Sequence, residues 1–354
     1  MQTKRLLLSV GLLVPALLAF RLPAAKVRFA PAEGSSTVKT FESKGEFTLD
    51  SMSMTMNGSE MPEMDMSMTV TSNQKIVVTD DYVALREGGT KTLKRRFDEI
   101  GNETAIAFKV EAMGQSQSND KTVQSKSELT GKTVVFSWDD DSYKKAFDPA
   151  EDNETLLEGL DEDMDLRVLL PKNEVKEGEE WTLDVKTLVP LLVPGGNLSL
   201  KPEDSDEGDD MGMGMPGMGG NMSEWLSDLL EGDAKAKFLG ERTVDDTKVA
   251  AIQVTIKIKS SKDISALVQE QLEKSKLPAV DSMNLDSMDV ELEIEGEGEL
   301  LWDLAKGRAH SFELSGPARM TMDMSMKLGV QGQTMSMQQS MQMSGTTNVT
   351  AKFE

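Results

Sequence analysis

Polar and apolar residues alternate with a period of two along most of this chain, and that pattern constrains the fold more than any other feature. It is clearest in two methionine tracts, Met52-x-Met54-x-Met56 and Met320-x-Met322-x-Met324-x-Met326, where Ser, Thr or Asp fills each x. Successive side chains of a β-strand point to opposite faces, so this alternation predicts half-buried strands. We therefore expect a mainly β protein with one or more large antiparallel sheets, an open half-barrel being one such arrangement, and two or three short helices packed on it.

Turn-forming residues divide the alternating pattern into separate strands. The expected strands cover residues 46–56, 64–71, 75–86, 92–98, 104–113, 121–129, 132–138, 168–170, 181–188, 234–244, 248–259, 288–302, 308–315, 318–330 and 335–353. The expected turns include Asn57-Gly58, Gly88-Gly89, Gly101-Asn102, Thr130-Gly131 and Asp245-Asp246. The apolar positions change phase across Asp50-Ser51, which predicts a β-bulge there. Short helices are expected near 154–160, after Ser223, and over 263–276.

Composition divides the chain into five segments. These are a signal peptide at 1–25, a flexible N-terminal segment at 26–45, an N-terminal β-rich half at 46–201, an acidic Gly/Met-rich loop or linker at 202–222, and a C-terminal β-rich half with two helices at 223–354. One continuous sheet and two sub-domains are both compatible with this order. The similar methionine tracts of the two halves are compatible with an ancient duplication and equally with independent origins.

The first residues have the layout of a signal peptide. Lys4 and Arg5 precede an apolar run that ends at Phe20 and contains Pro15, too short and interrupted for a membrane-spanning anchor. Cleavage is expected after Ala25, with Ala32 as the alternative. Because the chain has no cysteine, it has no lipoprotein acylation site, no disulfides and no thiolate ligands. We therefore expect a protein that is free in the periplasm or secreted.

Charge and composition exclude some functions. The net charge is -23 for the whole chain, and nucleic acid binding needs the opposite sign. His310 is the only histidine, so clusters of histidine ligands cannot form. No nucleophile elbow accompanies it, and we expect His310 to be structural. We therefore predict that the protein is not an enzyme.

Methionine is the compositional outlier, with 25 residues. In the alternating tracts we expect methionines to pack on one face of the sheet while the intervening polar residues face solvent. The candidate metal ligands are instead the five methionines interleaved with glycine in the acidic loop: Met211, Met213, Met215, Met218 and Met222. This segment resembles the methionine-rich segments of copper transporters and copper-resistance proteins, which implies Cu(I) binding. A plain linker is the alternative interpretation.

A broader resemblance rests on recurring turn sequences. The spaced residues Pro171, Val175, Gly178 and Trp181, together with Ser127-x-Leu129-x-Gly131-Lys132 and Trp302-Asp303-x-x-x-Gly307-Arg308, resemble uncharacterised exported β-rich bacterial proteins of unknown function. Since that family has no assigned activity, the resemblance implies no functional residue.

Two functions from different classes are therefore expected. The first is a non-catalytic envelope protein that binds an apolar ligand or a protein partner on its sheet, without a cofactor. A concave methionine face of this kind would be similar to those of periplasmic lipoprotein carriers. The alternative is the binding or handling of Cu(I) or Ag(I) through the methionine-rich segments.

Overall fold

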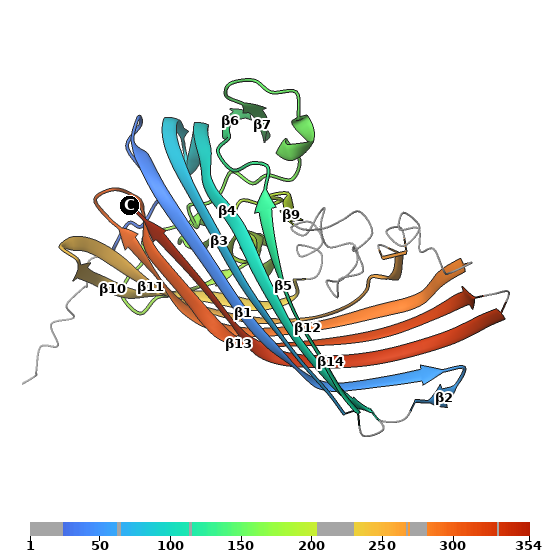
Figure 1. The fold of residues 1–354 in the computed structure, drawn as a ribbon. Coiled ribbons are helices and arrows are strands. Elements are labelled where there is room, and N and C mark those ends of the chain that lie inside the picture. Colours follow the sequence, from blue (N-terminus) through green and yellow to red (C-terminus); the bar gives the residue numbers. More distant parts are fainter. Residues whose placement is uncertain are drawn as a thin grey trace, which may run out of the picture.

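The chain folds around one large antiparallel sheet (Figure 1). The computed structural model describes residues 24–61, 65–112, 115–203, 230–266, 268–269, 282–330 and 333–354. The strand order is β7-β6-β4-β3-β1-β14-β13-β12-β11-β10-β8, with β2 beside β1, and β5 between β4 and β9. The two ends of this order are not paired with each other, so the sheet is open. The predicted class, a mainly β protein with a few short helical turns, is confirmed.

The strands are long. Their bounds are β1 Ser36–Met56, β2 Ser59–Glu60, β3 Asp65–Arg86, β4 Gly89–Ala112, β5 Gln115–Ser127, β6 Thr133–Asp139, β7 Ser142–Phe147, β8 Glu180–Leu183, β9 Leu200–Pro202, β10 Gly232–Val244, β11 Thr247–Asp263, β12 Ser282–Asp303, β13 Arg308–Val330 and β14 Gln333–Phe353. The short helical elements are η1 Glu154–Leu157, η2 Arg167–Leu169, η3 Val185–Leu188 and α1 Val189–Leu192. Of the helix expected over 263–276, residues 265–266 and 268–269 are helical, whereas Asp263 ends β11. Residues 267 and 270–276, and the helix expected after Ser223, lie outside the described residues.

Several local predictions are confirmed. The register of β1 against β14 shifts between Leu49 and Ser51, as the change of phase across Asp50-Ser51 predicts. Asn57-Gly58 turns the chain from β1 to β2 with positive φ at both residues. Asp245-Asp246 joins β10 to β11 in the same way.

Other local predictions are wrong, two of them because turn-forming residues occur inside strands. Gly101 lies within β4, opposite Lys75 of β3 and Lys126 of β5, so the expected turn is absent there. Pro317 likewise lies within β13, which joins the two strands expected at 308–315 and 318–330. Residues 168–170 belong largely to the 3-10 helix η2 instead of a strand, and the strand expected at 181–188 ends at Leu183, before the 3-10 helix η3. Pairing on both sides overrides the local turn signal at Gly101.

The segment at 26–45 is not a flexible tail. The backbone of Ala25 pairs with Val175 through hydrogen bonds of 2.8 and 3.0 Å, and the side chains of Val27 and Phe29 are buried. β1 then begins at Ser36. Apolar burial on the main core orders this segment, although its polar composition predicts flexibility.

The two β-rich halves form one sheet. β1 pairs with β14, so the halves join at the middle of the strand order. β8, from the first half of the sequence, pairs with β10 at the far edge of the second. The boundaries expected at 46–201 and 223–354 therefore do not separate structural units, and the sequence's open choice between one sheet and two sub-domains is resolved as one sheet.

The segment between β7 and β9 covers one face of the sheet. Its apolar residues, among them Leu156, Leu169 and Leu188, pack with sheet residues such as Phe97, Phe312 and Ile252 in the main core. The helical turn expected near 154–160 is confirmed as η1, with Leu156 and Leu157 buried. This layer lies over only part of the long strands (Figure 1).

A band of glycines crosses the sheet where its long strands bend. Gly45 of β1 lies opposite Thr347, which in turn lies opposite Gly316 of β13. A Cβ atom on Gly316 would be 1.8 Å from the carbonyl oxygen of Glu295, and one on Gly345 would be 2.0 Å from that of Glu46. The backbones of neighbouring strands approach here too closely for any side chain.

Beyond this glycine band, the far ends of four strands project past the covering layer (Figure 1). We call this part of the sheet the arm; it consists of residues 49–56, 285–292, 320–330 and 333–343.

Candidate functional site: the methionine face of the arm

The methionines of the arm lie in register across neighbouring strands. Three rungs run across β1, β14 and β13: an outer rung of Met56, Met337 and Met326, a middle rung of Met54, Gln339 and Met324, and an inner rung of Met52, Met341 and Met322. Met343 and Met320 follow in the next rung, and β12 adds Leu285, Met288, Val290 and Leu292. We call this set the methionine face. Directly opposite residues have Cβ atoms about 4.5–5.5 Å apart, so neighbouring side chains of a rung are in contact range.

The methionine face continues the face that forms the main core. On β13 the same alternation passes from the buried Phe312 and Leu314 to Met320 and Met322. On β14 it passes from Ala351 and Val349 to Met343. Among the described residues, the covering layer ends before the arm does, so these residues leave part of the apolar surface uncovered.

Only one side of the methionine face is covered among the described residues. Ile264 and Val268 pack over Leu285, Met288, Val290 and Met322. The Ile264 amide donates to the Met288 carbonyl at 2.8 Å, which fixes this covering segment to β12. Towards β1 the methionines are half-buried, and Met56 is 38 % exposed. An apolar surface that is half-open to solvent is a common feature of binding surfaces.

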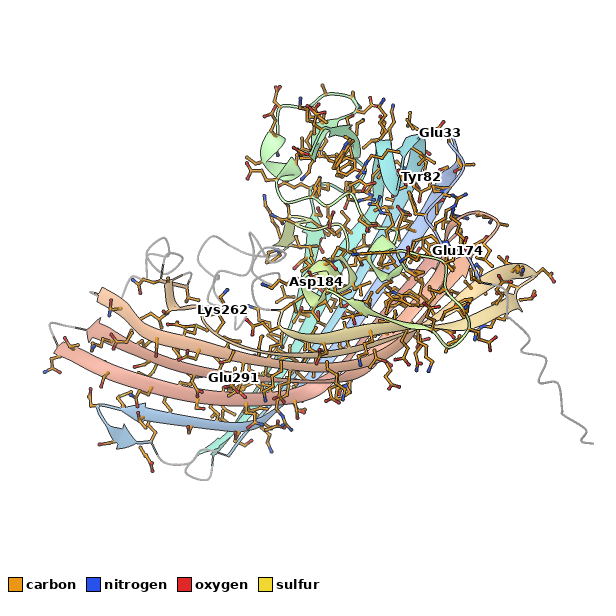
Figure 2. The ribbon with its side chains drawn as sticks, turned by 180° about the vertical axis from the view of Figure 1, so that it is seen from behind. Glu33, Tyr82, Glu174, Asp184, Lys262 and Glu291 are labelled. Atoms are coloured by element: carbon orange, nitrogen blue, oxygen red, sulfur yellow. The ribbon has the colours of Figure 1, made fainter. Side chains whose placement is uncertain are left out.

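The other face of the arm is polar. Ser53 and Thr55 of β1, Asp323 of β13 and Gln338 of β14 alternate with the methionines. The Thr55 hydroxyl donates to the Gln338 amide oxygen at 3.4 Å. Glu291 of β12, labelled in Figure 2, also belongs to this polar face, opposite Thr321. The two faces of the arm therefore differ as the alternation predicts.

The metal ligands expected from the sequence are not part of this face. Met211, Met213, Met215, Met218 and Met222 lie outside the described residues, so their Cu(I) site stays a prediction. Within the described part of the chain, no group of three or more His, Asp or Glu side chains is arranged to hold a metal ion. His310 lies at the irregularity where β13 has one residue more than β12, between Ala309 and Ser311.

A second cluster, which the sequence reasoning missed, lies in the core. Asp80 accepts two hydrogen bonds of 2.7 Å from Arg95, and Lys39 Nζ lies 2.6 Å from Asp80 and 2.7 Å from Asp165. Tyr82, labelled in Figure 2, donates its hydroxyl to Asp165 at 2.5 Å. We call these five residues the buried ionic network; their side chains are fully buried.

The network connects the sheet to its covering layer. Arg95 donates to the backbone carbonyls of Asp161 and Glu162 at 2.8 and 2.9 Å. Glu162 in turn accepts from Thr90 at 2.6 Å and pairs with Arg167. These contacts fix the segment 161–167 against β3 and β4.

The network shifts the protonation equilibria of its members. Burial alone would raise the pKa of Asp80, but the positive charges of Arg95 and Lys39 outweigh it and hold that pKa below its ordinary value. Burial, followed by the charges of Asp165 and Asp80, raises the pKa of Tyr82 well above its ordinary value. Tyr82 is therefore a neutral hydrogen-bond donor at physiological pH. Because the network is closed to solvent, we assign it a structural role.

Comparison with known proteins identifies no family. No family model matches the chain, and no curated protein matches it. Among solved structures, it is similar to the outer membrane protein OprG from Pseudomonas aeruginosa (8 % identity over 91 % of this chain and 97 % of that one, TM-score 0.18). It is also similar to OccK7 (OpdD) from the same organism (9 % identity over 90 % and 98 %, TM-score 0.19). At TM-scores this low, neither likeness carries an argument about fold or function.

The structure itself defines a class: an open antiparallel β protein whose apolar face extends past its covering layer. Among the helices that the described residues form, none has the length and apolar character needed to span a membrane.

Proposed function

We propose that this is a non-catalytic protein of the cell envelope that binds an apolar ligand, or an apolar surface of a partner protein, on the methionine face. One observation carries the proposal: the core face of the sheet continues onto the arm, where its methionines are half-exposed. Burying apolar surface is favourable, so a ligand that covers this face would gain the free energy that the covering layer supplies elsewhere.

The choice of methionine supports a binding role. Its side chain is unbranched and flexible, so it adapts to ligands of different shape. A sheet that only needed to be packed would favour Leu, Ile and Val, which have better-defined rotamers. The main core follows that rule, with Ile252, Val254 and Ile256 in succession on one strand. Methionine is instead concentrated on the arm, most of which the described part of the covering layer does not reach.

A non-catalytic role is supported by where the charged groups lie. The acids and bases of the buried ionic network have fully buried side chains, which no substrate can reach. The rungs of the methionine face carry thioethers, Gln339 and aliphatic side chains, which supply no general acid or base. Lys262 of β11, opposite Val290, is an ionisable side chain at the edge of this face.

A charge placed on the methionine face should weaken binding. We expect Met337→Lys to reduce the affinity for a fluorescent long-chain fatty acid at least tenfold, because the ammonium group would have to be desolvated under the bound chain. Ser336→Lys is the matched control, since it adds the same charge one residue away on the exposed polar face. Fluorescence titration of the purified protein measures both. No binding by wild type would argue against an apolar small-molecule ligand, and equal weakening by both variants would argue against the methionine face.

Export through a signal peptide is part of this proposal, with cleavage after Ala25. Cleavage after Ala32 would remove Val27 and Phe29, which are buried in the main core, whereas cleavage after Ala25 keeps both. We therefore expect the mature chain to begin at Lys26. Intact-mass measurement of protein recovered from the cell envelope tests this, and a mass that includes Met1 would contradict export.

A further inference from the structure

The outer rung of the arm places three thioethers side by side. Met56 lies opposite Met337 on one side, and Met326 lies opposite Met337 on the other. Adjacent strands are about 4.8 Å apart, and a methionine side chain can reach across that spacing. Three sulfur atoms from three strands can therefore converge on one point above Met337.

The ends of these strands are fixed beside the rung. The Asn57 amide donates to the carbonyl of Ser336 at 2.8 Å, and the Ser336 amide donates to Asn57 Oδ1 at 2.9 Å. These two hydrogen bonds hold the end of β1 against β14 one residue from the rung. The backbone that carries Met56 and Met337 is therefore held together without a ligand, which lowers the entropic cost of binding.

The outer rung is the most solvent-exposed of the three rungs, so its thioethers are the most accessible to a cation. Met322 of the inner rung is only 9 % exposed and belongs to the cluster under Ile264 and Val268. In the outer rung Met56 is 38 % exposed and Met337 is half-buried, and within the described residues neither of these two packs into a hydrophobic cluster. Met326 is half-buried and packs against the edge of the cluster under Ile264 and Val268.

Neutral thioethers select soft cations. Methionine sulfur binds Cu(I) and similar ions, whereas carboxylates and water are preferred by Mg²⁺ and Ca²⁺. No lysine or arginine occupies a position in the three rungs, so a cation meets no like charge there. The chain's net charge of -23 also favours the approach of cations in general.

We propose that Met56, Met326 and Met337 form a binding site for a soft monovalent cation, Cu(I) or Ag(I). Met54 and Met324, two residues along their strands on the same face, are within reach as further ligands. The site uses the methionine face but does not depend on that face binding an apolar ligand. It is also separate from the sequence-predicted site at Met211–Met222.

The test is a titration of the purified protein with Ag(I) nitrate in chloride-free buffer, in which isothermal calorimetry measures the heat of binding. Cu(I) kept reduced by ascorbate, in competition with a chromogenic chelator, is the parallel measurement. The triple variant Met56→Leu, Met326→Leu and Met337→Leu removes the sulfurs and keeps the side-chain volume. The matched controls are Met68→Leu with Met164→Leu, which are buried elsewhere in the sheet and core, and the five-Leu variant of Met211, Met213, Met215, Met218 and Met222.

We expect wild type and both controls to bind Ag(I), and the outer-rung variant to bind it at least tenfold more weakly. Binding that is lost only in the five-Leu variant would overturn the proposal, as would no binding by wild type. Apolar-probe binding is measured on the same variants, and Met-to-Leu changes should leave it intact, so failure of the metal site is distinguishable from failure of the proposed function.

A second readout needs no variant. A cation bound to a thioether engages the sulfur lone pair that would attack peroxide, so bound Ag(I) should protect the ligands from oxidation to the sulfoxide. Mass spectrometry of peroxide-treated wild type should therefore show protection of Met56, Met326 and Met337 by Ag(I), relative to the half-buried Met335, which lies opposite Leu328 beyond the outer rung. Uniform oxidation with and without Ag(I) would overturn the assignment even if the triple variant failed to fold.

Discussion

Asp80→Ala is expected to lower the free energy of unfolding by about 3–5 kcal/mol, because it leaves Lys39 and Arg95 buried with too few counter-charges. Asp80 makes the shortest contacts of both cations, at 2.6 and 2.7 Å, and all three side chains are fully buried. Denaturant unfolding at pH 7 measures the loss. Among variants that each remove one member of an ion pair, Asp80→Ala should be the least stable.

Glu99→Ala is the matched control for Asp80→Ala. It also removes an acid from the β3–β4 pair of strands, but the partner Lys75 is 46 % exposed and Glu99 is 53 % exposed. Solvent replaces the lost contact there, so the effect on stability should be several-fold smaller. Equal losses in the two variants would show that the buried ionic network does not hold β1, β3 and β4 together.

The stability that Asp80 contributes should depend on pH, and the direction of this dependence follows from its pKa. The pKa of Asp80 is lower in the folded protein than its ordinary value of 3.8, so its contribution to stability is present above that pH. It is lost as the pH falls from 3.8 through the folded pKa. The stability difference between wild type and Asp80→Ala should therefore be largest near neutral pH and shrink below about pH 4.

The sequence contained a signal for this network that alternation alone could have revealed. Asp80 lies between Val78 and Tyr82, and Arg95 lies between Leu93 and Phe97, so both charges occupy inward positions of their strands. Single charges of opposite sign at inward positions predict pairing, because a lone buried charge is too costly. What alternation could not supply is the register that places Asp80 opposite Arg95.

Local patterns predicted local structure well. The bulge after Leu49 and the turns at Asn57-Gly58 and Asp245-Asp246 depend on a few neighbouring residues. The order of the strands in the sheet does not depend on neighbouring residues in this way. β1 and β14 are neighbours although Lys39 pairs with Phe353 across almost the whole chain, and nothing in either segment alone specifies that partner.

The same limit applies to the methionine face. Alternation predicts which side of each strand carries methionine, but it does not show that residues 52–56, 320–326 and 335–343 share one surface. That shared surface also offers a physical reason for the similarity of the tracts: neighbouring strands on one face meet the same ligand or solvent environment. Similar composition therefore does not by itself indicate duplication.

The bend that separates the arm from the main core could not be predicted from the sequence, for a related reason. A glycine within a strand has several meanings, and Gly101 and Gly316 look alike in their local sequence contexts. They differ only in what the neighbouring strand places beside them. A Cβ on Gly101 would meet only the Ser125 carbonyl oxygen, at 3.9 Å, whereas one on Gly316 would overlap the backbone of β12.

Gly316→Ala should therefore lower the free energy of unfolding by about 3 kcal/mol or more, since the added Cβ would lie 1.8 Å from the Glu295 oxygen and 2.9 Å from Gly296 Cα. All of the atoms it meets first are backbone, so the clash can be relieved only by separating β12 from β13 at the bend. Gly101→Ala has no such obstacle, and it should leave stability unchanged or raise it by up to about 1 kcal/mol through the lower entropy of the unfolded chain. Thermal and denaturant unfolding should therefore show a clear loss of stability for Gly316→Ala and no loss for Gly101→Ala. If Gly316→Ala proved as stable as Gly101→Ala, the close approach of β12 and β13 would not be what bends the sheet and leaves the methionine face beyond its cover.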